Sequence, residues 1–78
     1  YVGILREAFV SMDQAQNILV IKTVSGMAMA VATALDNIGW KEIVGCIAGD
    51  DTIMLVVHEA ASHGEVREFL SQIIPNIK

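Results

Sequence analysis

The chain has 78 residues, 54% of them hydrophobic, and a formal net charge of −4, which allows one domain and leaves more apolar surface than so small a core can bury. Its five lysines and arginines are scattered along the sequence, which excludes nucleic-acid binding by this chain alone, because a phosphate backbone requires a basic patch. No segment reaches the roughly 18 uninterrupted apolar residues of a membrane span, and the charges of Arg6, Glu7 and Asp13 argue against a secretory signal.

The first part of the chain predicts a β-hairpin. Residues 3–12 favour a strand, and residues 18–23, which are rich in β-branched side chains, favour a stronger one. The turn-forming segment 13–17 (DQAQN) lies between them, so we expect the two strands to pair.

A helix is predicted over residues 27–38, which are rich in alanine. Ser25 is the expected N-cap, and Gly39 is expected to end the helix. Because apolar residues run almost all the way round this helix, we expect it to be covered on two sides, by the sheet of its own subunit and by a second element or molecule.

The second part of the chain repeats this arrangement. Strands are predicted over 43–48 and 52–58, joined by a tight turn at Gly49-Asp50-Asp51. The segment Ser62-His63-Gly64-Glu65 matches a capping box and predicts a second helix, whose apolar positions are Val66, Phe69, Leu70, Ile73 and Ile77. The order β-β-α-β-β-α predicts an α+β fold of two layers, a four-stranded and mostly antiparallel sheet with both helices on one face. The run 53–57 is apolar at alternate and intervening positions alike, so both faces of this strand are expected to be buried, and the sheet face without helices is expected to form a subunit interface.

Asp50 and Asp51 are adjacent carboxylates between two apolar runs, with no cation nearby in the sequence. An ordinary polar turn accounts for them, because Asp and Gly favour turns. The alternative is a cation site, where paired carboxylates accept a guanidinium or bind a hard metal ion, although a metal site needs more oxygen ligands than this segment offers.

Residues 23–26 lead into the start of the predicted helix, where unpaired N–H groups suit a carboxylate. A plain strand-to-helix turn explains the same residues. Taken together, a carboxylate site at residues 26–29 and a cation site at the two aspartates fit a basic amino acid.

The remaining candidates favour ordinary roles. His58 and His63 are not spaced as a standard ligand pair, and Met27 and Met29 are typical packing residues. Cys46 is the only cysteine, so it is expected to be a small buried hydrophobe in a reducing, cytoplasmic setting. No nucleophile lies in a recognisable pattern with a base, so an enzyme is the least favoured function.

The segment Gly45–Ile53 (GCIAGDDTI), with Gly26-Met27-Ala28, Ala32 and Leu35-Asp36-Asn37 before it, resembles the C-terminal domain of bacterial arginine repressors. That family typically shows G-x-A at the helix entry, L-D near the helix end and G-T-I-A-G-D-D-T-I at the hairpin. The match spans essentially the whole chain, and its I-A-G-D-D-T-I segment is specific.

The resemblance implies a single domain over residues 1–78 that binds L-arginine, as co-repressor and without any cofactor, and assembles into trimers that pair as hexamers. Operator DNA would be bound by an N-terminal winged helix-turn-helix absent from this chain, and no membrane partner is implied. Asp50 and Asp51 would contact arginine, and the pocket would be lined by Ala28, Met29, Asp36, Cys46 and Ala48. Met29 stands where relatives often carry Gln or His, and Cys46 where Thr is common, which weakens hydrogen bonding at both positions. A purely structural assembly module is the alternative function.

Overall fold

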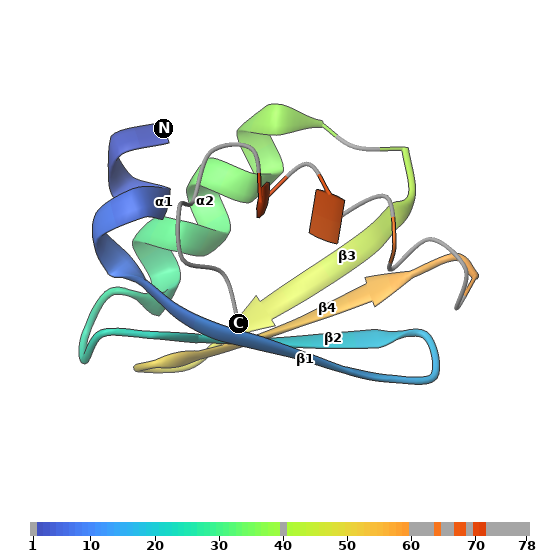
Figure 1. The fold of residues 1–78 in the computed structure, drawn as a ribbon, viewed down its shortest axis with the longest axis horizontal. Helices are drawn as coiled ribbons and strands as arrows, with labels where there is room; N and C mark the ends of the chain where they lie inside the picture. The colour runs from blue at the N-terminus through green and yellow to red at the C-terminus, as the bar shows by residue number, and fades with distance from the viewer. Residues whose placement is uncertain (1, 40, 60–63, 65–66, 69, 72–78) are drawn as a thin grey trace.

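The computed structural model describes residues 2–39, 41–59, 64, 67, 68, 70 and 71. Its elements follow the order α1 (Val2–Ala8), β1 (Phe9–Ala15), β2 (Ile18–Thr23), α2 (Ala28–Ile38), β3 (Ile43–Ala48) and β4 (Thr52–Val57). The strands form one sheet in the order β1-β2-β4-β3, and every neighbouring pair is antiparallel. Both helices lie on one face of this sheet (Figure 1), which confirms the predicted two-layer α+β fold, although α1 is not one of the two helices that were predicted.

The prediction of a strand over residues 3–12 is wrong for its first half, which forms α1. Leu5 and Ala8 are buried, and the residues between them are exposed, which is the spacing of a helix face. A helix of seven residues is too short to be stable alone. Its packing against α2 and the sheet therefore decides its conformation.

The β1–β2 turn is tighter than the sequence predicts. Residues 13–15, assigned to the turn, continue β1, and only Gln16 and Asn17 separate the strands. Gln16 adopts a left-handed backbone conformation (φ 55°), as two-residue hairpin turns require. The N–H of Val57 donates to the carbonyl of Asn17 at 2.9 Å, so this turn is also tied to the end of β4.

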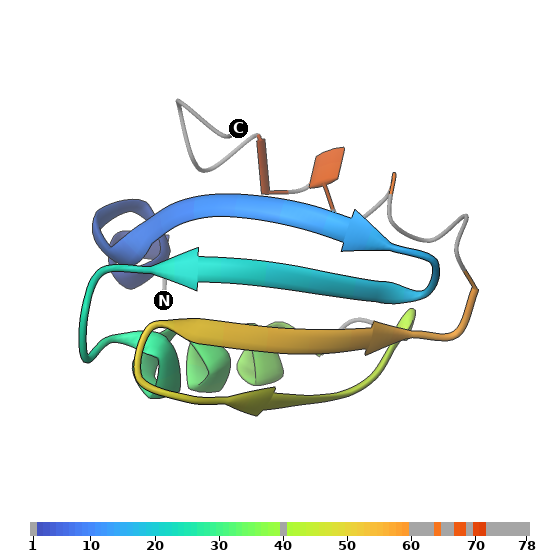
Figure 2. The same ribbon diagram turned by 90° about the horizontal axis from the view of Figure 1, so that it is seen from below.

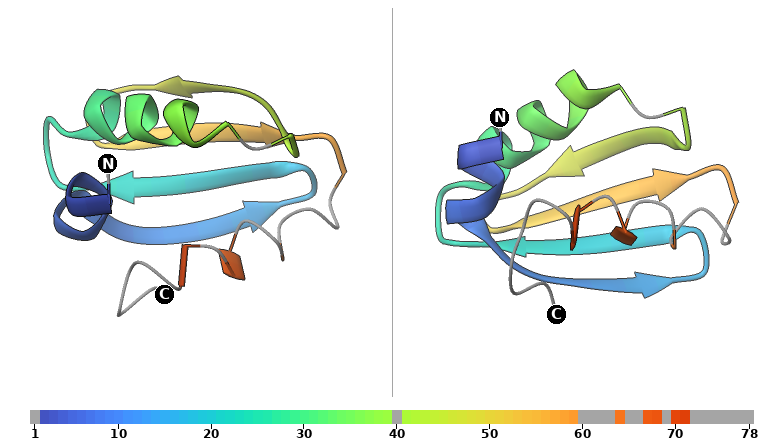
Figure 3. Two further views of the ribbon diagram at one scale, coloured as in Figure 1. Left: turned by 90° about the horizontal axis from the view of Figure 1, so that it is seen from above. Right: turned by 45° about the horizontal axis from the view of Figure 1, so that its top comes forward.

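Helix α2 lies over the β3–β4 half of the sheet (Figure 3) and also contacts α1. The predicted cover on its second side is thus supplied in part by α1 of the same chain. Its buried residues are Ala28, Val31, Ala32, Ala34 and Leu35. Gly39 ends the helix in a left-handed conformation, as predicted, whereas the predicted N-cap is wrong: the cap position is Met27, and no side chain caps the helix.

The core lies between the helices and the inner face of the sheet, where Leu19, Ile21, Ile53 and Leu55 are fully buried. Because side chains alternate along a strand, the residues between them point to the other face. None of the described helices and strands covers that outer face (Figure 2). It carries an apolar group that we call the outer patch: Ile18, Val20, Val44, Ile47, Met54 and Val56.

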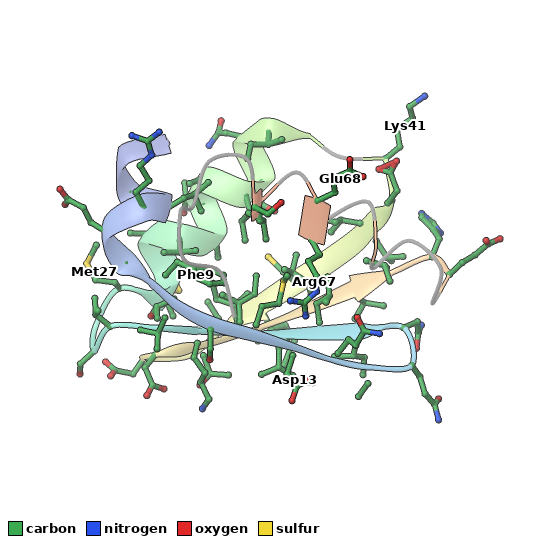
Figure 4. The ribbon with its side chains drawn as sticks, viewed as in Figure 1. Phe9, Asp13, Met27, Lys41, Arg67 and Glu68 are labelled. Atoms are coloured by element: carbon green, nitrogen blue, oxygen red, sulfur yellow. The ribbon has the colours of Figure 1, made fainter. Side chains whose placement is uncertain are left out.

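Most of the predicted C-terminal helix, with its capping box at Ser62, His63 and Glu65, lies outside the described residues. Of this segment Gly64, Arg67, Glu68, Leu70 and Ser71 are described, all helical, and Leu70 is buried in the core. Arg67 points toward the sheet (Figure 4), where its Nη2 donates to the carbonyl of Met12 at 3.5 Å. None of the described helices is long and apolar enough to cross a membrane.

Candidate functional site

The turn between β3 and β4 is held against the β2–α2 loop by backbone hydrogen bonds. The N–H of Thr23 donates to the carbonyl of Asp51 at 2.8 Å, and the N–H of Ala28 donates to the carbonyl of Asp50 at 3.2 Å. Within the turn, the N–H of Gly49 donates to the carbonyl of Thr52 at 2.8 Å. Both loops lie at the same end of the sheet in Figure 2. The two regions that the sequence singled out as possible ligand sites therefore adjoin in space.

The Asp50 carboxylate lies at the entry to α2. Its Oδ2 accepts hydrogen bonds from the Ser25 hydroxyl at 3.2 Å and from the Gly26 N–H at 3.3 Å. The sequence suggested that a ligand carboxylate rests near residues 26–29, whereas in this structure a carboxylate of the chain itself lies at the first of these residues. Ser25, predicted as a helix cap, instead donates to Asp50.

Asp51 is linked to the only side-chain cation that the described residues bring into this network. The Thr52 hydroxyl donates to Asp51 Oδ1 at 2.9 Å, and Lys22 Nζ donates to the Thr52 hydroxyl at 2.9 Å. Lys22 reaches this point because it pairs with Thr52 between β2 and β4. The two aspartates have no cation nearby in the sequence, but the strand register brings one from 30 residues away.

A second group of the predicted residues lies at the other end of α2. The Cys46 thiol on β3 contacts the Asp36 carboxylate on α2, with Sγ 3.7 Å from Oδ1. Burial, the Asp36 charge and this hydrogen bond all raise the pKa of the Cys46 thiol. Asp36 is eight residues beyond Ala28 in the same helix, or about 12 Å along its axis. The seven predicted residues thus form two groups along the α2–β3 side of the molecule.

These residues form an open surface within one chain. Asp36, Asp50 and Asp51 are exposed, and Met29 is 66% exposed. Cys46 and Ala48 are half-buried, and Ala28 is buried. The hollow beside Asp36, lined also by Leu35, Gly39 and Ile43, measures about 80 Å³. An amino acid bound to these side chains would therefore stay accessible to solvent unless a second molecule covered it.

The described residues do not form a metal site. No three His, Cys, Asp or Glu side chains among them lie close enough together to hold an ion. His58 is exposed, and His63 lies outside the described residues. The carboxylate pair is thus better suited to an organic cation, because a guanidinium needs only a pair of acceptors.

Three further residues belong to the site, although no pattern in the sequence predicts these contacts: Ser25, Lys22 and Thr52. Thr52 adjoins the aspartates in the sequence, so its place beside them was a visible signal. Lys22 carries no local signal, and Ser25 was marked only as a helix cap within the candidate segment 23–26. The contacts of both depend on which strands pair and on how the β2–α2 loop meets the β3–β4 turn.

Comparison with known proteins gives one consistent result. The sequence model of a family described as "Arginine repressor, C-terminal domain" matches residues 5–72. The chain is 60% identical over 74 residues to an arginine repressor of Lachnoclostridium phytofermentans, covering 95% of the chain and 49% of that relative. It is 54% identical over 76 residues to an arginine repressor of Lachnospira eligens, covering 97% and 50% respectively. The chain thus spans about half the length of the curated relatives it matches.

Proposed function

The chain belongs to the family of arginine repressor C-terminal domains, and we propose that it is the L-arginine-sensing and oligomerising domain, over residues 1–78, of a transcriptional regulator of arginine metabolism. Arginine binds between copies of the chain and favours their assembly. Operator DNA is bound by another part of the full-length protein. In this proposal the domain is not an enzyme and needs no cofactor or metal.

The observation that carries the arginine proposal is the position of Asp50 and Asp51. Their turn is anchored by the backbone bonds to Thr23 and Ala28, yet both carboxylates remain exposed. Two negatively charged hydrogen-bond acceptors at a fixed place match a guanidinium better than an ammonium. The guanidinium is planar and donates two parallel hydrogen bonds, whereas the ammonium is a compact charge. The guanidinium also relieves the repulsion between the two carboxylates, which Lys22 offsets through Thr52.

The outer patch supports assembly of several copies. Within it Val44 is 59% exposed, Ile47 is 78% exposed and Met54 is 46% exposed, and these side chains line a shallow groove of about 380 Å³. Contiguous apolar surface of this kind typically marks an interaction site. We assign a second copy of this chain as its occupant, because the open arginine site also requires a covering molecule.

Titration calorimetry of the 78-residue chain with arginine, citrulline and lysine tests the ligand. Arginine is expected to bind most tightly, since citrulline has the same shape without the charge and lysine has the charge without the planar group. At about 100 times its dissociation constant, arginine should stabilise the folded chain by about 2.7 kcal/mol in thermal unfolding. Equal binding of arginine and citrulline, or no binding of arginine, would overturn the proposal.

Sedimentation with and without arginine tests the coupling to assembly. A ligand held between copies must raise the association constant of the chain, because it binds the assembled form in preference. A purely structural module would assemble to the same extent in both conditions, and that result would favour the alternative function.

A further inference from the structure

Ser25 contacts the arginine site only through Asp50. Its hydroxyl donates to Asp50 Oδ2 at 3.2 Å, and the adjacent Gly26 N–H donates to the same oxygen at 3.3 Å. No hydrogen bond from the described part of the chain reaches Asp50 Oδ1. One oxygen of this carboxylate is therefore held by the protein, and the other remains for a ligand.

The hydroxyl of Ser25 is not needed to build the surrounding backbone. Helix α2 has no side-chain cap, so Ser25 does not stabilise its start in that way. The turn that carries Asp50 is anchored by the backbone bonds from Thr23 and Ala28, which do not involve any side chain. Loss of the Ser25 hydroxyl should thus leave the turn in place and free only the Asp50 side chain.

We propose that Ser25 is a positioning residue for the arginine site, whose hydroxyl, together with the Gly26 N–H, orients the Asp50 carboxylate so that Oδ1 is presented to the guanidinium. This inference rests on the proposed function and adds to it a residue outside the carboxylate pair. A side chain held in one orientation before binding loses less conformational freedom when the ligand arrives, so the affinity is higher.

Asp51 provides an internal comparison, because it is oriented by a different hydroxyl. Thr52 Oγ1 donates to Asp51 Oδ1 at 2.9 Å. Ser25 and Thr52 thus act on different carboxylates. Removing either hydroxyl should weaken arginine binding, but only the effect of Ser25 should depend on Asp50.

The test is a double-mutant cycle in the 78-residue chain, read by titration calorimetry with L-arginine. Ser25→Ala should weaken arginine binding about two- to tenfold, the cost of ordering one additional side chain on binding, and Ser25→Thr should retain the wild-type affinity. On an Asp50→Ala background, Ser25→Ala should change the affinity less than twofold, because its partner is gone. Thr52→Val, the matched control, should weaken binding by the same factor in both backgrounds.

Two results would overturn the inference while leaving the proposed function intact: wild-type affinity in Ser25→Ala, or an equal loss from Ser25→Ala in both backgrounds. Absence of arginine binding by the wild-type chain would instead overturn the proposed function, and the inference with it. Thermal unfolding of each ligand-free variant separates a fold defect from a positioning effect, since Ser25→Ala should unfold at the wild-type temperature.

Discussion

Replacing Ile47 with Gln should weaken assembly without unfolding the chain. Ile47 is 78% exposed on the outer patch, so the single chain gains little from it. Complete burial of an isoleucine side chain is worth about 1.5–3 kcal/mol, and 78% of that is about 1–2 kcal/mol for each chain whose Ile47 becomes covered. A change of this size lowers an equilibrium constant about 5- to 30-fold.

Sedimentation equilibrium over a range of protein concentrations measures this change directly. The matched control is Ile4→Gln on α1, where the isoleucine is 38% exposed but lies on the helical side of the sheet. Urea unfolding at a concentration where the chains are monomeric should give Ile47→Gln nearly wild-type stability, whereas Ile4→Gln should lose stability because the fold buries most of the Ile4 side chain. Unchanged association in Ile47→Gln, or equal weakening in Ile4→Gln, would refute the assignment of the outer patch as the subunit interface.

Asp50→Asn and Asp51→Asn should each weaken arginine binding about 10- to 100-fold in calorimetry, since hydrogen bonds to charged groups are worth about 1.5–3 kcal/mol; wild-type affinity in both would leave their turn without a role in binding. Asp36→Asn should speed alkylation of Cys46 by iodoacetamide near pH 8, because the Asp36 charge raises the pKa of the thiol and its removal increases the thiolate fraction; an unchanged rate would contradict that cause. Gly39→Ala should destabilise the chain by about 1–2 kcal/mol in urea unfolding, because its φ of 73° is left-handed. Backbone strain is the whole of this cost, since the surroundings have room for the methyl group; wild-type stability would show that the helix ends differently in solution.

The elements with a strong local pattern could be predicted from the sequence. Strands β2 and β3 and the end of α2 have the expected bounds, because β-branched runs, alanine-rich helix and Gly39 act over a few residues. Helix α1 could not be predicted from the sequence, because Leu5 and Ala8 favour a helix only when α2 and the sheet cover them. The β1–β2 turn was assigned too many residues because Asp13 and Gln14 are common in turns yet lie on an edge strand.

In the candidate site, too, some residues have a local sequence signal and others depend on distant contacts. Asp50 and Asp51 could be identified from the sequence, since two adjacent carboxylates between apolar runs stand out locally. The roles of Lys22 and Ser25 could not, because each depends on a contact across 25 or more residues. Predicting them requires the pairing of β2 with β4, which no short segment specifies.

The anchoring of the β3–β4 turn by main-chain bonds has a consequence for protein engineering. Because the N–H groups of Thr23 and Ala28 bind the carbonyls at positions 51 and 50, any pair of side chains placed there is displayed at the same location. The side chains at these two positions can thus be changed to alter ligand preference without loss of the fold. A library randomised at these two positions alone should yield mostly folded variants, from which sensors for other amino acids can be selected.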